Sequence, residues 1–236
     1  MSCLITHKEI KTVAIDIDDT VINLLDAWLT YLNNHHNTKV KREDITEWDI
    51  TKAFPELSND EVFSPLYEKD FWESVVPLPY SYQYLKKLYD NGYIVKFVTA
   101  ASYDTIKYRL ENVIFTYYNF IKEKDIIICQ DKQYIDCDVL IDDNVDNLKN
   151  FKGIRFLIDA PYNKSDKYRD CYDMRVKNLK DVYQILQLSQ VHKRNNLDNM
   201  TAKRVRSRLN PDIYDISASG LSSCAIGHYS VHKCNL

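Results

Sequence analysis

The sequence predicts an α/β protein built on a parallel sheet with helices on both faces, and a small helical insertion after the first strand. Short apolar runs that are typical of buried strands alternate along the chain with segments whose apolar residues recur at helical spacing. Residues 35–79 interrupt this alternation, because four prolines and several large aromatic side chains lie there among polar stretches. A chain of 236 residues is long enough for one core and one small accessory unit.

The predicted elements divide the chain into a core, an insertion and a tail. We expect strands at 12–17, 93–98, 126–129, 138–141 and 154–158, each an apolar run of four to six residues. Helical spacing predicts helices over 21–32, 81–89, 102–117 and 178–188. Residues 1–20 and 80–189 then form the core, 21–79 form the helical insertion, and 190–236 form a basic C-terminal extension with no assigned role.

Charge and cysteine content narrow the class of protein. The net charge of −3 argues against a body that holds nucleic acid non-specifically. In residues 191–236, seven Lys/Arg against three Asp give a charge of +4, so a nucleic-acid contact is left open for this tail. The six cysteines show no metal-binding spacing, and the sequence predicts neither a signal peptide nor a membrane span. These features predict a cytoplasmic protein with reduced thiols, and they leave homodimer formation open.

Acidic and hydroxyl residues follow three of the predicted strands. They are Asp16-Ile17-Asp18-Asp19-Thr20, then Thr99, then Asp142-Asp143. Because parallel strands present their carboxyl ends at one edge of the sheet, these side chains should converge there. Converging carboxylates repel one another, and a divalent cation with oxygen ligands would neutralise them; Mg²⁺ is the expected ion.

Such a cluster suits the hydrolysis of a phosphate monoester. A cation and a lysine screen the phosphate dianion, so that an ionised Asp can attack it. A second carboxyl group protonates the leaving alkoxide and then activates water. A covalent aspartyl-phosphate divides the reaction into two easier steps.

Four segments resemble the motifs of the haloacid-dehalogenase-like (HAD) phosphatases. They are VAIDIDDT at 13–20, IVKFVT at 94–99, Lys132, and LIDD at 140–143. The resemblance implies an HAD-like, Rossmann-like core in which Asp16 is the nucleophile and Asp18 the general acid/base. It implies that Mg²⁺ is held by Asp16, the backbone carbonyl of Asp18, and Asp142. It further implies that Thr99, Ala100 and Lys132 bind the phosphate. Asp143 is then expected to contact the metal ligands without binding the metal itself.

Within that superfamily the chain is similar to the 5′(3′)-deoxyribonucleotidases. The stretch DFWESVVPLPYSYQYLKKL, the ten-residue step from Lys132 to Asp142, and APYNKS at 160–165 carry this similarity. The chain departs from that subfamily at Asp19, where a Gly is usual, and at Thr20, where an aliphatic residue is usual. The insertion stands where the family has a helical cap that selects the substrate.

The similarity implies a nucleotide substrate, most specifically a deoxyribonucleoside monophosphate. Leu24, Phe71 and Trp72 are the expected substrate contacts, and Trp48 is expected in the core of the cap. Another small phosphoester or a polynucleotide end is the alternative substrate. A non-catalytic binding or scaffold protein is the alternative class, and the intact set of acidic residues and Lys132 argues against it.

Overall fold

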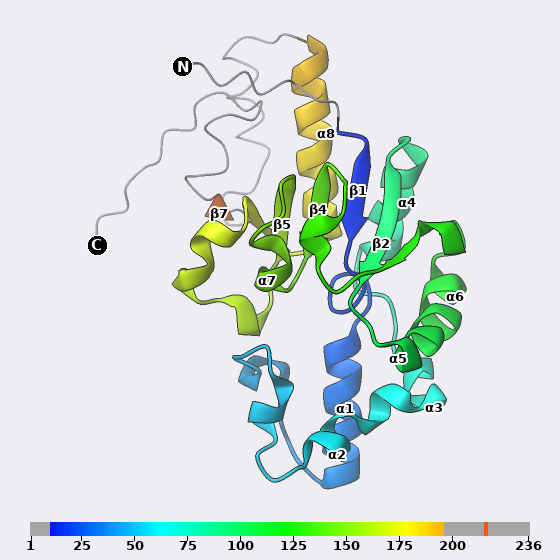
Figure 1. The fold of residues 1–236 in the computed structure, drawn as a ribbon, viewed down its shortest axis with the longest axis vertical. Helices are drawn as coiled ribbons and strands as arrows, with labels where there is room; N and C mark the ends of the chain where they lie inside the picture. The colour runs from blue at the N-terminus through cyan, green and yellow to red at the C-terminus, as the bar shows by residue number, and fades with distance from the viewer. Residues whose placement is uncertain (1–9, 196–214, 217–236) are drawn as a thin grey trace.

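A computed structural model describes residues 10–195 and 215–216 (Figure 1). Its seven-stranded sheet has the order β3-β2-β1-β4-β5-β6-β7, in which the first six strands are parallel and β7 is antiparallel to β6. The strands are β1 (Thr12–Ile15), β2 (Ile94–Thr99), β3 (Ile126–Ile128), β4 (Val139–Asp142), β5 (Ile154–Ile158), β6 (Met174–Val176) and β7 (Asp215–Ile216). The predicted parallel sheet is therefore confirmed, with two short strands, β6 and β7, added at one edge.

Helices cover both faces of the sheet. Along β1, Val13 and Ile15 belong to one hydrophobic cluster, whereas Ala14 between them belongs to another, as the alternation of side chains in a strand requires. The first cluster includes α4 (Ser81–Asp90) and α8 (Leu179–Asn195), and the second includes α7 (Val145–Leu148). The core is thus a three-layered α/β unit, as expected.

Two core helices differ from the prediction. The segment expected as one helix over 102–117 contains α5 (Tyr103–Tyr108), the π-helix η4 (Arg109–Ile114) and α6 (Phe115–Tyr117). Helix α8 continues to Asn195 rather than ending at 188, so the predicted boundary at 190 falls inside a helix. Of the predicted basic extension, residues 196–214 and 217–236 lie outside the described residues. No helix in the described ranges is long and apolar enough to cross a membrane.

Residues 21–79 form a helical insertion beyond the carboxyl end of β1 (Figure 1). Its elements are α1 (Leu24–His36), η1 (Arg42–Asp44), η2 (Ile50–Ala53), α2 (Asn59–Phe63), η3 (Ser64–Tyr67) and α3 (Lys69–Glu73). Leu29, Leu32 and Phe54 belong to a small hydrophobic cluster that also includes Ala160 and Tyr162 of the core. The remaining short turns lie in the core, at η5 (Glu123–Asp125), η6 (Lys132–Tyr134), η7 (Pro161–Asn163) and η8 (Asp166–Cys171).

The two chain segments that connect the insertion to the core are hydrogen-bonded to each other. Asn23 N donates to Val76 O at 2.8 Å, and Leu78 N donates to Val21 O at 2.9 Å. This pairing explains why α1 begins at Leu24 and not at Val21, because the Val21 carbonyl already accepts from Leu78 N and the Asn23 N–H already donates to Val76 O. The insertion is therefore joined to the core through a single pair of adjacent segments.

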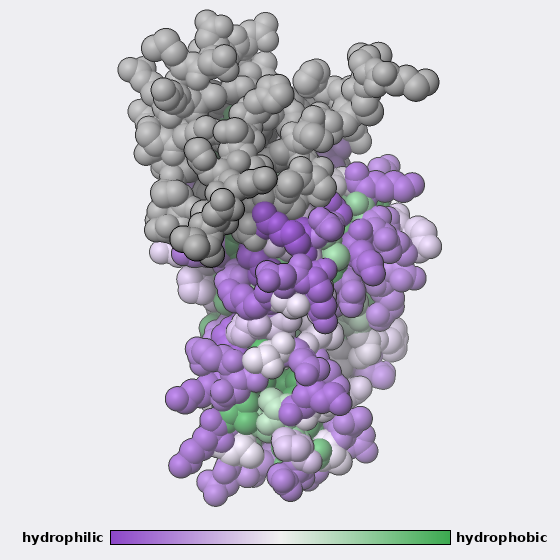
Figure 2. Space-filling view, turned by 90° about the vertical axis from the view of Figure 1, so that its left-hand side faces the viewer, coloured by the Kyte–Doolittle hydropathy of each residue, from purple (hydrophilic) through white to green (hydrophobic). Residues whose placement is uncertain are grey.

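The surface differs between the two parts of the molecule. On the face shown in Figure 2, hydrophobic residues are exposed mainly at the lower end, over the insertion, whereas the described core surface above it is largely hydrophilic. Trp48 in the insertion is 59% exposed, so the expectation that it lies in the core of the cap was wrong.

Candidate active site

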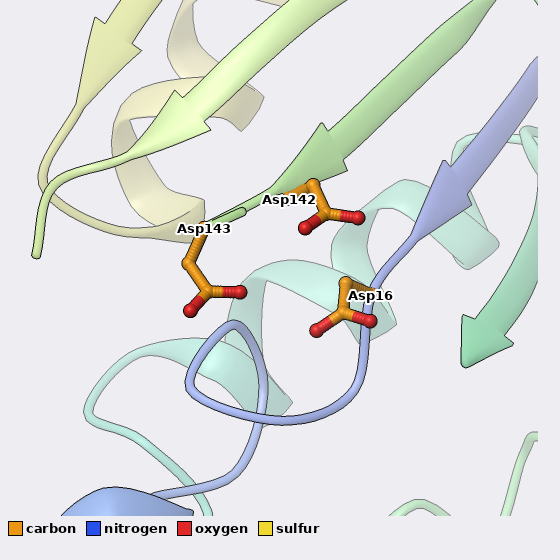
Figure 3. Close-up of side chains that lie close together, drawn as sticks. All are labelled: Asp16, Asp142 and Asp143. Carbon is orange, nitrogen blue, oxygen red and sulfur yellow. The ribbon is translucent and has the colours of Figure 1, made fainter. Parts of the chain in front are cut away.

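Three carboxylates from two neighbouring strands face one another at the carboxyl edge of the sheet. Asp16 follows β1, Asp142 ends β4, and Asp143 comes next (Figure 3). Backbone pairing sets this register, since Asp16 N donates to Ile141 O at 2.8 Å. One oxygen from each carboxylate lies within 4.8 Å of the others, and all three residues are buried.

Lys132 brings one positive charge into this cluster. It lies in η6, it is 1% exposed, and its Nζ donates to Asp16 Oδ1 and, at 2.7 Å, to Asp142 Oδ2. The resemblance to the family motifs and the ten-residue step to Asp142 predicted that Lys132 would reach this site, and the structure places it there.

One lysine does not neutralise three buried carboxylates. Burial raises the pKa of Asp16 to about 8, and the nearby Asp142 and Asp18 add to the rise, although Lys132 opposes it. Burial also raises the pKa of Asp143 well above its usual range, with Asp16 and Asp142 contributing. A further cation would satisfy this set, and three hard oxygen donors suit a divalent metal ion.

Asp142 and Asp143 are held by side chains that the sequence did not single out. Asn147 Nδ2 donates to both oxygens of Asp142, at 3.1 and 3.0 Å. The Tyr162 hydroxyl donates to Asp143 Oδ2, and Asn163 Nδ2 donates to the Asp143 carbonyl at 2.8 Å. Tyr162 and Asn163 belong to the APYNKS stretch, which carried a family similarity in the sequence but no assigned contact.

The Asp18 carboxylate is not part of this three-carboxylate cluster and pairs with an arginine. Its Oδ1 accepts a hydrogen bond from Arg109 Nε at 2.8 Å. Arg109 was not predicted, because in the sequence it stands beside the apolar stripe of a helix and reads as a solvated residue. The role of the Asp18 backbone carbonyl in metal binding stays a prediction.

Thr99 and Ala100 lie where the second motif places them, at the carboxyl end of β2. The buried Thr99 Oγ1 accepts from Ala101 N at 3.1 Å, and the Ala100 carbonyl accepts from Gln130 Nε2 at 2.8 Å. The second bond joins this loop to the segment that carries Lys132. Phosphate binding by Thr99 and Ala100 stays a prediction.

Asp19, the departure from the subfamily pattern, has a defined local role. Its φ is +49°, in the left-handed region that favours glycine and that Asp tolerates better than most residues. Its carboxylate accepts from Leu25 N at 3.1 Å and pairs with Arg42 of η1 at 3.1 Å. Burial raises the pKa of Asp19 to about 7, while Arg42 lowers it. Asp19 therefore joins the loop after Asp16 to the start of α1 and to the insertion.

The expected substrate contacts are packed inside the protein. Leu24, Phe71 and Trp72 are all buried in the larger hydrophobic cluster. Trp48 is an exposed aromatic ring close to the site, and its centroid lies 5.3 Å from that of Tyr162. Since the Tyr162 hydroxyl reaches Asp143, the Trp48 ring is separated from the acidic cluster by one tyrosine side chain.

A family model and several curated proteins match this chain. Residues 9–194 match the family model described as 5′ nucleotidase, deoxy (Pyrimidine), cytosolic type C protein. A 5′(3′)-deoxyribonucleotidase from Bacillus subtilis (strain 168) is 31% identical over 157 residues, which cover 66% of this chain and 89% of that protein. One from Clostridium acetobutylicum is 31% identical over 176 residues, which cover 72% and 97%.

Solved structures agree on the fold. A conserved haloacid dehalogenase-like protein from Agrobacterium tumefaciens matches with a TM-score of 0.53 at 11% identity, covering 76% of this chain and 98% of that one. The HAD-hydrolase YfnB from Bacillus subtilis, bound to magnesium, matches with a TM-score of 0.50 at 17% identity, covering 76% and 99%. At these identities the match establishes the HAD-like, Rossmann-like fold alone.

Proposed function

Because this chain belongs to the 5′-nucleotidase, deoxy (pyrimidine), cytosolic type C family of phosphatases, we propose that it hydrolyses deoxyribonucleoside monophosphates through an aspartyl-phosphate at Asp16. The observation that carries the mechanism is the contact of one buried lysine with both Asp16 and Asp142. Lys132 holds a carboxylate in place and supplies positive charge where a phosphate dianion must approach it.

The proposed first step is an attack by the Asp16 carboxylate on phosphorus. An oxygen–phosphorus bond forms to Asp16 as the bond to the nucleoside oxygen breaks, and Asp18 gives its proton to that leaving oxygen. In the second step Asp18 takes a proton from water, and the resulting hydroxide attacks phosphorus and releases Asp16. The two proton transfers cancel, so the enzyme returns to its starting state.

A divalent metal fits the donor set of Asp16 and Asp142, and Mg²⁺ is the ion that we propose. When bound, it would stabilise the charge that develops on the phosphoryl oxygens. The backbone carbonyl of Asp18 is the proposed third ligand, and Asp143, tied to Tyr162 and Asn163, would keep the pair at 142–143 in register.

The helical insertion is the proposed cap over this site. It lies beyond the sheet edge that carries the acidic cluster, and Arg42 of the insertion reaches Asp19 in the loop after the nucleophile. Such a cap can exclude water and select the leaving group. Trp48 offers an exposed aromatic face on which a base can stack, and Leu24, Phe71 and Trp72 would shape the slot from beneath.

A panel of phosphoesters tests this function. The purified full chain, supplied with Mg²⁺, should hydrolyse dUMP and dTMP faster than the matching ribonucleotides, sugar phosphates or a 5′-phosphorylated oligonucleotide. Asp16→Asn should lower turnover at least a thousandfold while leaving the circular-dichroism spectrum and melting temperature close to those of the wild type, because the amide is nearly isosteric but not nucleophilic. A panel in which sugar phosphates or oligonucleotide ends are the best substrates would contradict the nucleotidase assignment.

A further inference from the structure

Arg109 is a buried cation beside the site that the proposed mechanism does not use. It is the first residue of the π-helix η4, and it is only 4% exposed. Its Nε donates to Asp18 Oδ1 at 2.8 Å. A guanidinium group stays charged in proteins, so its burial requires hydrogen-bond acceptors, and Asp18 Oδ1 accepts from it whether or not Oδ2 carries the proton that the mechanism exchanges.

The guanidinium group is fixed from the core and from the insertion together. On the core side its Nη1 donates to Thr105 Oγ1 at 3.0 Å. On the other side its central carbon lies 4.4 Å from the centroid of the Trp72 ring, a distance typical of a cation–π contact. Trp72 belongs to α3 of the insertion, and its own Nε1 donates to Leu66 O at 2.9 Å, which sets the orientation of the ring.

The backbone around Arg109 is irregular at this point. A regular helix over 102–117 would continue from α5, but the chain forms six residues of π-helix starting at Arg109. Such turns are rare, and they occur often at functional sites. The change of helical repeat accompanies the inward placement of an arginine that the α-helical pattern would leave beside the apolar stripe.

We propose that Arg109 is the positioning residue for Asp18. Because Trp72 of the insertion contacts Arg109, the insertion influences the orientation of Asp18 through this contact. The inference rests on the proposed function, in which Asp18 exchanges the proton. By holding Oδ1, Arg109 fixes the carboxylate plane and leaves Oδ2 for the leaving oxygen and then for water. A movement of the insertion that displaced Trp72 would free the guanidinium group, and Asp18 would lose its fixed orientation.

The two half-reactions allow a direct test with the full chain. An aryl phosphate has a leaving group that needs no protonation, so the formation of phospho-Asp16 does not depend on Asp18, whereas its hydrolysis does. In Arg109→Lys, we expect the pre-steady-state burst of aryl alcohol to keep its rate within about threefold. Hydrolysis of the phosphoenzyme and turnover of dUMP should fall about 10- to 100-fold, less than the 10²–10⁴ that general acid–base catalysis supplies in full.

Matched variants separate this role from others. Arg155→Met removes another partly buried ion pair, that of Arg155 with Asp173 at 2.7 Å toward the amino end of β5, and should leave both phases unchanged. Trp72→Leu should show the same pattern as Arg109→Lys but more weakly. In an Asp18→Asn background, Arg109→Lys should change neither phase further, since it acts through the missing carboxylate.

Two results would overturn the proposal. If the burst slows as much as the hydrolysis and the loss persists in Asp18→Asn, then Arg109 binds the phosphate directly. If every rate falls in parallel with the melting temperature, and Arg109→Lys with Asp18→Asn shows no coupling in urea unfolding, then Arg109 is only structural. A wild-type chain that hydrolyses neither substrate would refute the proposed function instead, and the unfolding cycle would still report on the Arg109–Asp18 pair.

Discussion

Lys132 and Asp142 form an ion pair, 2.7 Å long, between two side chains that are both almost wholly buried. The same Nζ contacts Asp16 Oδ1, so a single cation joins the carboxyl ends of two adjacent strands. Separating such a pair leaves an uncompensated charge in the interior, and the site is therefore predicted to depend on Lys132 for stability as well as for turnover.

Lys132→Met should lower the free energy of unfolding by about 3–5 kcal/mol in the presence of a chelator, because two buried carboxylates then lose their shared cation. Turnover should fall at least a hundredfold. Urea unfolding with and without Mg²⁺ measures the first effect, and part of the lost stability should return when Mg²⁺ is added. Lys164→Met is the control, since the largely exposed Lys164 pairs with Asp159 on the surface and its loss should cost under about 1 kcal/mol. Equal losses in the two variants would contradict this account.

Metal binding is predicted to depend on Asp142. Titration calorimetry of the full chain should detect Mg²⁺ binding that Asp142→Asn weakens at least tenfold, because the amide carries no charge to offset that of the ion. A chelator should stop phosphatase turnover, Mg²⁺ should restore it, and Ca²⁺ should restore it poorly because its coordination is larger and looser. Turnover that persists in excess chelator would rule out the metal.

The parts of the site that the sequence predicted are those fixed by strand register. Asp16, Thr99 and Asp142 each follow or end a short apolar run, and parallel strands must bring such ends to one edge. Lys132 was predicted from the resemblance to the family motifs together with its spacing to Asp142. Such a group of residues can be predicted from the sequence without knowing how the rest of the chain packs.

The parts that the sequence missed depend on packing over long distances. Arg109 reaches Asp18 across 91 positions in the sequence and through a π-helix, neither of which leaves a periodic signal. Trp48 was expected in a small core, but that cluster is filled by aliphatic residues, Phe54 and Tyr162, and the indole ring stays largely exposed beside Tyr162. The strand β7 has only two residues, too few for an alternating pattern.

The positive φ of Asp19 leads to a prediction about this position, where the subfamily usually has Gly. Asp19→Gly would relieve the backbone but lose the hydrogen bond to Leu25 N and the pair with Arg42, so we expect a net loss of about 1 kcal/mol in the free energy of unfolding. Asp19→Asn keeps an acceptor and tolerates the same φ, and should lie closer to the wild type. Urea unfolding of the two variants compares them. A glycine variant more stable than the wild type would show that strain at this position outweighs its contacts.

Substrate discrimination is predicted to depend on Trp48 more than on Trp72. The Trp48 ring is 59% exposed beside Tyr162, so a base can stack on it, whereas the Trp72 ring is buried beneath Arg109. Stacking of a base on an aromatic side chain is worth about 1–3 kcal/mol by alanine substitution. Trp48→Ala should therefore raise KM for dUMP and dTMP about 5- to 100-fold and leave kcat little changed.

The matched comparison uses a small aryl phosphate and a second aromatic variant. Hydrolysis of the aryl phosphate should be nearly unaffected by Trp48→Ala, because that substrate carries no base to stack. Trp72→Leu should instead lower kcat for the nucleotides with a smaller effect on KM, through the contact of the Trp72 ring with Arg109. The proposed slot, lined by apolar side chains, would give a 2′-hydroxyl no partner, and burying it there costs free energy, so dUMP should remain preferred over UMP in both variants. Nucleotide KM values that stay at the wild-type level in Trp48→Ala would show that the base binds elsewhere, and would return Phe71 and Trp72 to consideration as the stacking surface.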